Sequence, residues 1–260
     1  MTTANSVVIG DDLKQVLRRL RLSPMLATLP ERITLARQRK LPHQDFMLVV
    51  LSDEVERRER AAAKGRASRA KLDPEMHLEA WDDTAKVTFD QELWAELCTL
   101  RFIEEHHHLL VLGPVGVGKT FLATALAHIA CRRGYSALMM RAEMMFKELK
   151  ASRLDQTYER ELRRMVGVDL LIIDDFALDH MDATESRDLY DIVLERHQRR
   201  SVIVTSNREP KEWLPLLADP IRAQSTVDRL QNAAYELVIE GESYRQRQKP
   251  QLSRKKGGKK

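Results

Sequence analysis

The stretch that most limits what this chain can fold into spans Leu109–Ala127 and reads LLVLGPVGVGKTFLATALA. An apolar run leads into a loop of the form G-x-x-x-x-G-K-T, and a helical apolar pattern follows it. Glycines in such a loop allow backbone angles that a Cβ would forbid, so successive N–H groups can point at one anion. The positive end of the following helix adds to this field. The stretch therefore predicts a phosphate-binding loop and a nucleoside triphosphate as its ligand.

The loop also carries the groups that would hold the ends of that ligand. Lys119 is expected to reach the β- and γ-phosphates, and the hydroxyl of Thr120 is expected to bind Mg²⁺. The predicted nucleotide-binding residues are Gly113, Pro114, Val115, Gly116, Val117, Gly118, Lys119, Thr120 and Phe121. A glycine-rich turn that binds nothing is the alternative.

A second stretch, 168–175, reads VDLLIIDD and predicts an apolar strand that ends in the carboxylates Asp174 and Asp175. In a parallel sheet buried on both faces, ligands bind at the carboxyl edge of the strands. Asp174 is therefore the candidate for holding Mg²⁺, directly or through water. Asp175 is the candidate for orienting and polarising the attacking water. An acidic turn after an ordinary strand is the alternative.

Two further side chains are candidates for the hydrolysis step. Asn207 follows the apolar strand over 201–205, and its amide would contact the γ-phosphate or the lytic water if that strand lies beside the one at 109–112. Asn is also a common turn residue, so this signal is weak by itself. Arg229 is the first choice, and Arg222 the second, for an arginine that reaches the γ-phosphate of a neighbouring subunit. Such a finger raises the rate by roughly 10³–10⁵. A surface arginine paired with an acid is the alternative.

The first part of the chain, residues 1–72, reads as a small all-helical domain. Apolar residues that recur at helical spacing predict one helix face at Leu13, Val16, Leu17 and Leu20. Ser23-Pro24 predicts the start of a second helix, and Pro42 opens a third that Gly65 interrupts. Since Lys71–Pro74 breaks the helical pattern, the domain boundary is predicted after residue 72.

Residues 73–250 alternate helices with short apolar strands, the pattern of a parallel sheet wrapped by helices. The predicted strands are 109–112, 136–140, 169–174, 201–205 and 236–239. The predicted helices between them include 91–103, 119–133, 142–150, 156–166 and 183–198. Too little chain follows the last strand for a C-terminal helical lid. Residues 251–260 are expected to form a basic disordered tail.

The formal net charge is +4, but the basic residues are unevenly spread, which points to a polyanionic partner. Solvated helix faces would account for part of this asymmetry. Duplex DNA attracts Lys and Arg at its phosphates without regard to sequence, and an aromatic content of 5% favours such contacts over base stacking on single strands. The residues predicted to bind duplex DNA, with low sequence specificity, are Arg57, Arg58, Lys64, Arg66 and Arg69, together with Lys147, Lys150 and Arg153.

The remaining composition favours a cytoplasmic protein. No run approaches the roughly 18 apolar residues of a membrane span. The N-terminus lacks the layout of a signal peptide. Cys98 and Cys131 lie in helical apolar patterns, which favours core filling over a disulfide. His106–His108 is interpreted as the polar entry to a strand, with metal binding as the alternative, because consecutive side chains on a strand point to opposite faces.

Together these motifs resemble a known family. Residues 75–247 look like an AAA+ ATPase of the DnaA/DnaC branch and, within it, the IstB family, the helper ATPases encoded beside the transposase of certain bacterial insertion sequences. The matching stretches are GPVGVGKT at 113–120, LLIIDDF at 170–176, TSN at 205–207, VDRL at 227–230 and IEGESYR at 239–245. The first two are generic to the superfamily, whereas the last two and the basic helical head favour IstB.

The resemblance implies an α/β AAA+ P-loop core with a five-stranded parallel sheet flanked by helices. It implies ATP and Mg²⁺ as ligands, and a homo-oligomer that assembles on duplex DNA, remodels the target site and recruits or stimulates the transposase near the bacterial nucleoid. Asp174 and Asp175 would be the Walker-B pair, Asn207 the first sensor and Arg229 the finger acting in trans. With no lid, Arg245 is only a candidate stand-in for a second-sensor arginine.

Three points stay open at this stage. Many AAA+ members carry Asp-Glu where this chain has Asp174-Asp175, and the shorter second side chain predicts slow, DNA-stimulated turnover. A replicative helicase loader of the DnaC type is the main alternative function, because both families share the ATPase motifs. A small-molecule phosphotransferase that uses the same loop is disfavoured, since no acceptor-binding lid is evident and the tail is basic.

Overall fold

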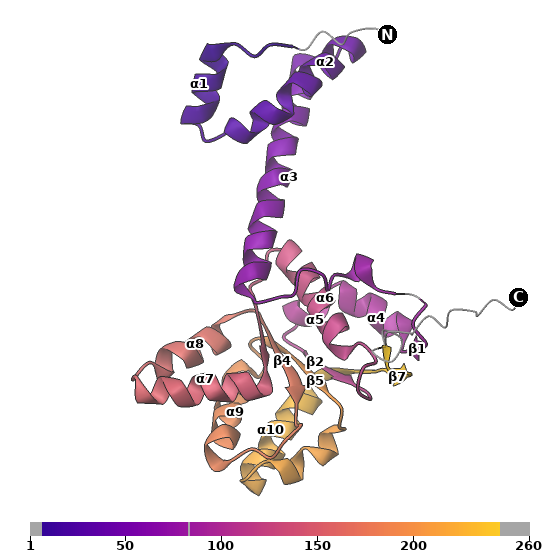
Figure 1. Ribbon diagram of the computed structural model, residues 1–260, viewed down its shortest axis with the longest axis vertical. Helices are drawn as coiled ribbons and strands as arrows, with labels where there is room; N and C mark the ends of the chain where they lie inside the picture. The colour runs from indigo at the N-terminus through magenta and orange to yellow at the C-terminus, as the bar shows by residue number, and fades with distance from the viewer. Residues whose placement is uncertain (1–6, 83, 245–260) are drawn as a thin grey trace, which may run out of the picture. The chain divides into compact units, whose positions relative to one another are not determined.

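The computed structural model describes residues 7–82 and 84–244 of the chain (Figure 1). The chain divides into two compact units between Lys64 and Gly65, inside helix α3 (His43–Arg69). This division lies ahead of the boundary predicted after residue 72. Ala70 and Leu72 are buried in the core of the second unit. The second unit therefore begins before the break in the helical sequence pattern at Lys71–Pro74.

The first unit contains α1 (Asp11–Arg19), the 3₁₀ helix η1 (Ser23–Ala27), α2 (Leu29–Arg39) and the start of α3. Its small core consists of Ile9, Leu17, Met25, Leu29 and Val50. Of the helix face predicted on α1, Leu17 is buried, whereas Leu13, Val16 and Leu20 are 44%, 51% and 61% exposed. The periodicity predicted the helix correctly, but so small a core covers only part of its apolar face.

Of two local predictions in this region, the helix start at Ser23-Pro24 is found as a short 3₁₀ helix, and the interruption at Gly65 is wrong. Ser23-Pro24 opens η1, and the α-helix begins only at Leu29, with a proline in its first turn. Gly65 does not interrupt α3, which continues to Arg69. A single glycine costs a helix about 1 kcal/mol, which is too little to end so long a helix. The chain leaves the helical path at Lys71, where φ is 60°.

The second unit is built on a five-stranded parallel sheet with the order β3-β4-β5-β2-β6. All five predicted strands are present, as β2 (His108–Leu112), β3 (Ala137–Arg141), β4 (Leu170–Phe176), β5 (Ser201–Ser206) and β6 (Ala234–Val238). Alternate residues of β2 face two different cores, because Leu109 and Val111 belong to one and Leu110 and Leu112 to the other. Both faces of the sheet are therefore covered, as continuous apolar strands require.

Helices cover both faces of this sheet (Figure 1). They are α4 (Gln91–Cys98), α5 (Arg101–Glu104), α6 (Lys119–Arg132), α7 (Ala142–Leu154), α8 (Tyr158–Gly167), α9 (Ala183–Arg196) and α10 (Pro220–Asn232), with the short 3₁₀ helices η2 (Leu78–Ala80), η3 (Pro210–Glu212) and η4 (Leu214–Leu216). The single helix predicted over 91–103 is divided at Leu100, where φ is 63°. None of the described helices is long and apolar enough to cross a membrane.

After β6 the chain folds back onto the rest of the second unit. The short strand β7 (Glu240–Gly241) pairs antiparallel with β1 (Val87–Thr88). The N–H of Tyr244 then donates to the carbonyl of Gly116 at 2.9 Å. Between α10 and the last described residue, Tyr244, the chain forms β6 and β7, and Tyr244 itself has helical backbone. The tail at 251–260 and Arg245 lie outside the described residues.

Candidate nucleotide-binding site

The glycine loop lies between the buried strand β2 and helix α6, as predicted. Gly116 has a φ of 86°, and a Cβ on it would come within 2.1 Å of the Ser243 hydroxyl oxygen, so a side chain is excluded there by backbone strain and by space. Lys119 is buried, and its Nζ donates to the carbonyls of Gly113 at 2.8 Å and Pro114 at 2.7 Å. The ammonium group is thus held inside the loop, beside the N-terminus of α6, where an anion binds favourably.

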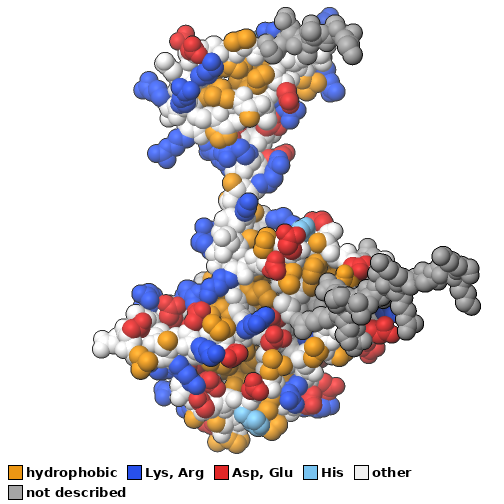
Figure 2. All heavy atoms as spheres, in the orientation of Figure 1, with side chains coloured by type: hydrophobic (Ala, Val, Ile, Leu, Met, Phe, Trp, Pro, Cys, Tyr) orange, Lys and Arg blue, Asp and Glu red, His pale blue; other side chains and the backbone are white. Residues whose placement is uncertain are grey.

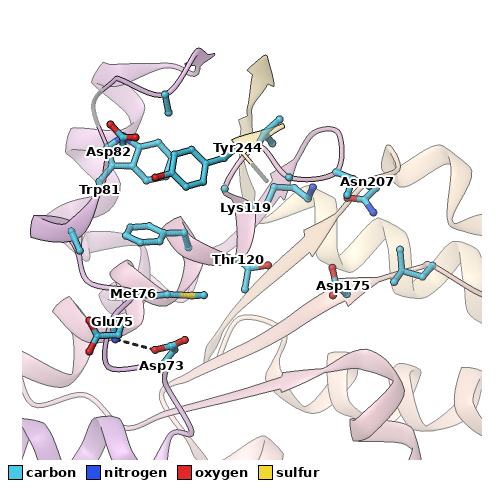
Figure 3. Close-up of a pocket in the computed structure, with 18 residues that line it drawn as sticks. Asp73, Glu75, Met76, Trp81, Asp82, Lys119, Thr120, Asp175, Asn207 and Tyr244 are labelled. Carbon is cyan, nitrogen blue, oxygen red and sulfur yellow. Dashed lines mark hydrogen bonds between the residues drawn. The ribbon is translucent and has the colours of Figure 1, made fainter. Parts of the chain in front are cut away.

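A cavity of about 630 Å³ opens over this loop (Figure 3). Its volume is in the range of small-molecule sites. It is lined at one end by Lys119, Thr120, Asp175 and Asn207, which come from three distant parts of the sequence. The sheet order explains this meeting, because β5 lies between β2 and β4, and all three strands end at the same edge.

Asp174 is almost fully buried at the end of β4, with 3% exposure. Its Oδ1 accepts hydrogen bonds from the hydroxyls of Thr120 at 2.9 Å and Thr205 at 2.6 Å. Burial raises the pKa of the Asp174 carboxyl, and the two hydroxyls oppose part of that shift. The carboxylate of Asp174 and the hydroxyl of Thr120 are hard oxygen donors of the kind that Mg²⁺ prefers, so the residues present fit that ion.

Asp175 follows with a left-handed backbone, at a φ of 53°. The register between β4 and β5 shifts at this point, between Ile173 and Phe176. The N–H of Asp175 donates to Oγ1 of Thr205 at 3.0 Å, which holds this conformation. Asp is one of the few residue types that tolerates left-handed angles. At this irregularity inside β4 the side chain of Asp175 lines the cavity, whereas Asp174 stays buried.

Asn207 comes directly after β5, which pairs in parallel with β2 as the prediction about this residue required. Its amide lines the same end of the cavity as Lys119 and Asp175. Sequence reasoning gave no role to Thr205, although it stands in the same TSN stretch. The only signal for it was its place at the end of a strand beside β4.

The two candidate arginine fingers lie away from the cavity, on α10. Nη1 of Arg229 donates to the carbonyl of Ser225 at 2.9 Å and to the Ser225 hydroxyl. Its guanidinium carbon lies 5.8 Å from the centre of the Tyr190 ring. Arg222 is ion-paired with Asp219 at 3.7 Å. Neither lines the nucleotide cavity of its own chain, and a role in a neighbouring subunit stays a prediction.

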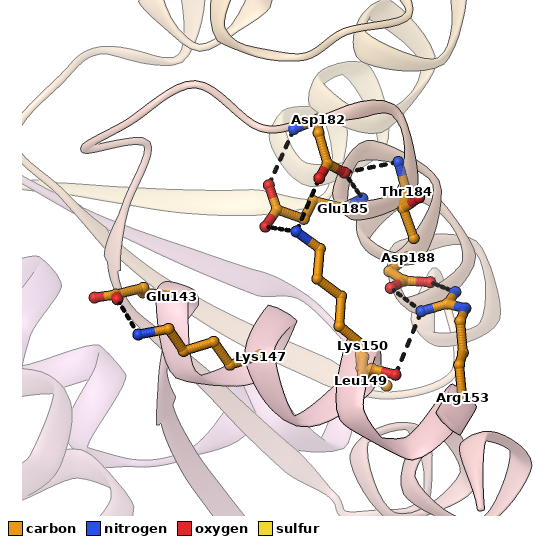
Figure 4. A network of polar contacts seen from close by, with 9 residues as sticks. All are labelled: Glu143, Lys147, Leu149, Lys150, Arg153, Asp182, Thr184, Glu185 and Asp188. Carbon is orange, nitrogen blue, oxygen red and sulfur yellow. Dashed lines mark hydrogen bonds and ion pairs between the residues drawn. The ribbon is translucent and has the colours of Figure 1, made fainter. Parts of the chain in front are cut away.

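The cations predicted on α7 to bind DNA are engaged in ion pairs (Figure 4). Lys147 pairs with Glu143 on its own helix at 2.6 Å. Lys150 pairs with Asp182 and Glu185, both at 2.8 Å, and hydrogen bonds to these carboxylates raise its pKa. Arg153 forms two hydrogen bonds with the buried carboxylate of Asp188. Lys150 and Arg153 therefore attach α7 to α9, and their charges are largely offset.

The cations predicted near the unit boundary differ in their surroundings. Arg57 and Arg58 both bond to the buried carboxylate of Glu54, and the hydrogen bond from Arg57 is the main cause that lowers the pKa of Glu54 to about 2. In the second unit, Arg66 donates to the carbonyl of Cys131 at 2.8 Å. Lys64 and Arg69 have no ion pair with any described residue. On the face in Figure 2, basic and acidic side chains are interspersed over the second unit.

The histidine and cysteine predictions concern the interior of the second unit. His108 is the first residue of β2 and is fully buried. No group of three or more potential metal ligands occurs among the described residues. Both cysteines are free thiols, and Cys131, on α6, is buried in one of the two cores of the second unit.

Three comparisons connect this geometry with known proteins. A family model described as IstB-like ATP binding protein matches residues 15–252. A Mycobacterium tuberculosis protein, whose name describes it as an ATP-binding protein in an insertion sequence, is 35% identical over 239 residues, which cover 92% of this chain and 95% of the relative.

Solved structures agree at the level of the fold. The crystal structure of DnaI matches with a TM-score of 0.56 at 23% identity, covering 65% of this chain and 95% of that one. The DnaC helicase loader matches with a TM-score of 0.55 at 17% identity, covering 64% and 98%. The chain therefore shares the AAA+ fold of these proteins, and the predicted fold is confirmed.

Proposed function

The chain belongs to the family of IstB-like ATP-binding proteins, and from this premise we propose that it is an ATPase that assembles on duplex DNA and assists a partner transposase in insertion-sequence transposition. One observation supports the catalytic part most directly. The cavity brings Lys119, Thr120, Asp175 and Asn207 to one end, beside the buried carboxylate of Asp174. These groups are of the kinds that bind a nucleoside triphosphate with Mg²⁺ and position the attacking water.

Each group has a distinct task in the proposed reaction. Lys119 and the N–H groups of the loop bind the β- and γ-phosphates. Thr120 and Asp174 hold Mg²⁺, which supplies positive charge to the phosphate oxygens. Asp175 orients the attacking water and accepts its proton, and Asn207 fixes the γ-phosphate or that water. Because the attacking oxygen must approach in line with the bond that breaks, positioning is the main contribution of these side chains.

Assembly and DNA binding form the second part of the proposal. Arg229 of one subunit would contact the γ-phosphate of the nucleotide bound to the next subunit. ATP would therefore favour the oligomer, and loss of the γ-phosphate on hydrolysis would weaken it. The basic residues of the head and the second unit would contact DNA phosphates, which gives low sequence specificity and association with the bacterial nucleoid. Lys64 and Arg69 are the first candidates. The other predicted cations form ion pairs with carboxylates or, in the case of Arg66, a hydrogen bond to a backbone carbonyl.

The deciding experiment measures ATPase rate and sedimentation of the full chain, each with and without duplex DNA and with a non-hydrolysable ATP analogue. The proposal expects DNA to raise the rate and the analogue with DNA to give a larger species. Affinity for DNA should fall with salt at a slope of about −0.9 per phosphate contacted. A chain that stays a single copy under all conditions, or a flat salt dependence, would contradict the proposal.

A DnaC-like replicative helicase loader is the second candidate, since the match to the DnaC structure spans almost all of that chain. The ATP site does not discriminate between the two, because both functions use the same motifs. A pull-down with purified transposase and purified replicative helicase as competing partners separates them. Retention of the helicase alone would favour the loader.

A further inference from the structure

The end of the cavity away from Asn207 is aromatic. Figure 3 shows Trp81 on that side and Asp175 and Asn207 on the other, with Lys119 and Thr120 between them. The rings of Trp81 and Phe121 have centroids 5.3 Å apart, and both residues line the cavity. Trp81 is held in turn by Phe89, whose ring centroid lies 6.1 Å away in an edge-on arrangement. The indole is thus fixed in place by aromatic packing, with one part left open to the cavity.

The indole also lies directly against the phosphate-binding loop. A Cβ on Gly118 would come within 2.8 Å of the far edge of the Trp81 ring. Gly118 has a φ of 100°, so both its backbone and its neighbour exclude a side chain. A ligand whose phosphates occupy the loop therefore has the indole as its next neighbour on the side away from Asp175.

The direction of the bound nucleotide follows from these positions. The terminal phosphate belongs at Asp175 and Asn207, where the hydrolytic groups are. The nucleoside must then extend to the opposite end, toward Trp81 and Phe121. A heterocyclic base stacks favourably on an aromatic ring. Removing the ring weakens binding of the base about 5- to 150-fold.

We propose that Trp81, supported by Phe121, forms the base subsite of this cavity, and that it stacks on a purine. This inference rests on the proposed function, because it takes the cavity to be a nucleoside triphosphate site. A purine offers the larger ring face, so its stacking on the indole exceeds that of a pyrimidine. Trp81 is the cavity-facing tryptophan among the three of the chain, since Trp94 and Trp213 are buried and do not line the cavity.

The test measures equilibrium binding of ATP, GTP, UTP and inorganic tripolyphosphate, each with Mg²⁺, to the full chain by calorimetry. Trp81→Ala should weaken ATP and GTP about 5- to 150-fold and leave tripolyphosphate unchanged. Trp81→Phe should retain most of the affinity. Trp94→Phe is the matched control, because Trp94 packs on Phe89 in the same aromatic cluster without lining the cavity.

Tryptophan fluorescence gives a second readout that needs no disruptive substitution. ATP should quench the emission of the wild-type chain and of Trp94→Phe, whereas Trp81→Phe should lose this response. Tripolyphosphate should quench much less than ATP.

Each other outcome contradicts a definite statement. Unchanged ATP affinity in Trp81→Ala, or an equal loss for ATP and tripolyphosphate, would overturn the base subsite and leave the ATP site standing. UTP binding as tight as ATP would overturn the purine preference. A wild-type chain that binds neither ATP nor tripolyphosphate would contradict the proposed function itself, and the base subsite with it.

Discussion

The hydroxyl of Thr205 donates to Oδ1 of Asp174 at 2.6 Å. The same hydroxyl oxygen accepts the N–H of Asp175 at 3.0 Å. One side chain on β5 thus fixes both carboxylates at the end of β4, the first through its oxygen and the second through its backbone. A hydroxyl has one proton to donate and lone pairs to accept, so both bonds form at once.

Thr205→Val keeps the shape of this side chain and removes both hydrogen bonds. It should lower kcat for ATP roughly 5- to 150-fold, corresponding to about 1–3 kcal/mol for an unsatisfied buried polar group. The affinity for ATP should change little, because the phosphate-binding loop is untouched. Thr205→Ser should recover most of the rate, and steady-state kinetics that separate kcat from KM provide the measurement. An unchanged kcat in the valine variant would refute this positioning role.

Lys119→Ala should abolish detectable ATP binding, because it removes the ammonium group that lies inside the loop. Calorimetric titration with the non-hydrolysable analogue measures the effect without turnover. Lys211→Ala is a matched control, since Lys211 is exposed and pairs with Glu209 outside the cavity. Tight binding by Lys119→Ala would show that the loop holds the nucleotide without its lysine.

Asp175 has a charged side chain and a left-handed backbone. Two substitutions distinguish the effect of the charge on hydrolysis from the effect of the backbone on stability. Asp175→Asn tolerates the left-handed angle, so it should keep stability and ATP binding while hydrolysis falls at least tenfold. Asp175→Val should also lower the free energy of unfolding by about 1–2 kcal/mol, because a β-branched residue is strained at a φ of 53°. Chemical denaturation and single-turnover hydrolysis check the two effects. Equal stability of both variants would show that the left-handed backbone at position 175 does not strain a β-branched residue.

Arg229→Ala should spare ATP binding and remove both hydrolysis and ATP-driven assembly, if this residue acts in trans. Mixing it with Lys119→Ala is the sharper measurement. A Lys119→Ala subunit still carries Arg229, and it can complete the intact ATP site of its Arg229→Ala neighbour. Partial recovery of ATPase activity in the mixture, with none in either variant alone, is the expected result. Recovery with Arg222→Ala in place of Arg229→Ala would assign the role to Arg222.

His108 should make the fold less stable in mild acid. Val202 N–H donates to its Nδ1 at 3.2 Å, which requires an unprotonated nitrogen there. Burial, and after it the charges of His197, Arg196 and His107, lower its pKa from 6.5 to about 4. The unfolded chain therefore takes up this proton first as pH falls. The stabilising contribution is complete above pH 6.5 and decreases from there to about pH 4, by at most about 3 kcal/mol.

Denaturation at several pH values tests this dependence. His108→Asn keeps an acceptor for the Val202 N–H and removes the titrating group, so its stability should vary less between pH 6.5 and 4. His106→Asn, at an exposed position that is not among the causes of the His108 shift, should behave as the wild type does. Parallel curves for the wild type and His108→Asn would show that other groups control the acid response.

The parts of the site that follow from strand and loop chemistry could be predicted from the sequence. The loop at 113–120, Asp174 and Asn207 each stand at the end of an apolar strand, and the parallel sheet brings those ends together. The left-handed backbone of Asp175 inside β4 could not be predicted from the sequence, because Asp is common in many other conformations. Trp81 was missed because its segment has no periodic pattern that could place it.

The sequence could not show the ion pairs that two of the predicted DNA-binding residues make. Lys150 and Arg153 read as free cations on a helix face, but their partners Asp182, Glu185 and Asp188 come from a helix later in the chain. On α1, the periodicity shows which side of the helix is apolar, but it does not show how much core is available to cover that side.

The contact between Tyr244 and Gly116 has a consequence for biosynthesis. The glycine loop is made near the middle of the polypeptide, yet its last backbone partner is added only when the ribosome has passed Tyr244. A nascent chain that exposes β2 and α6 alone still lacks the segment that covers the loop. The bond between the loop and Tyr244 therefore forms only after nearly all of the second unit has been synthesised.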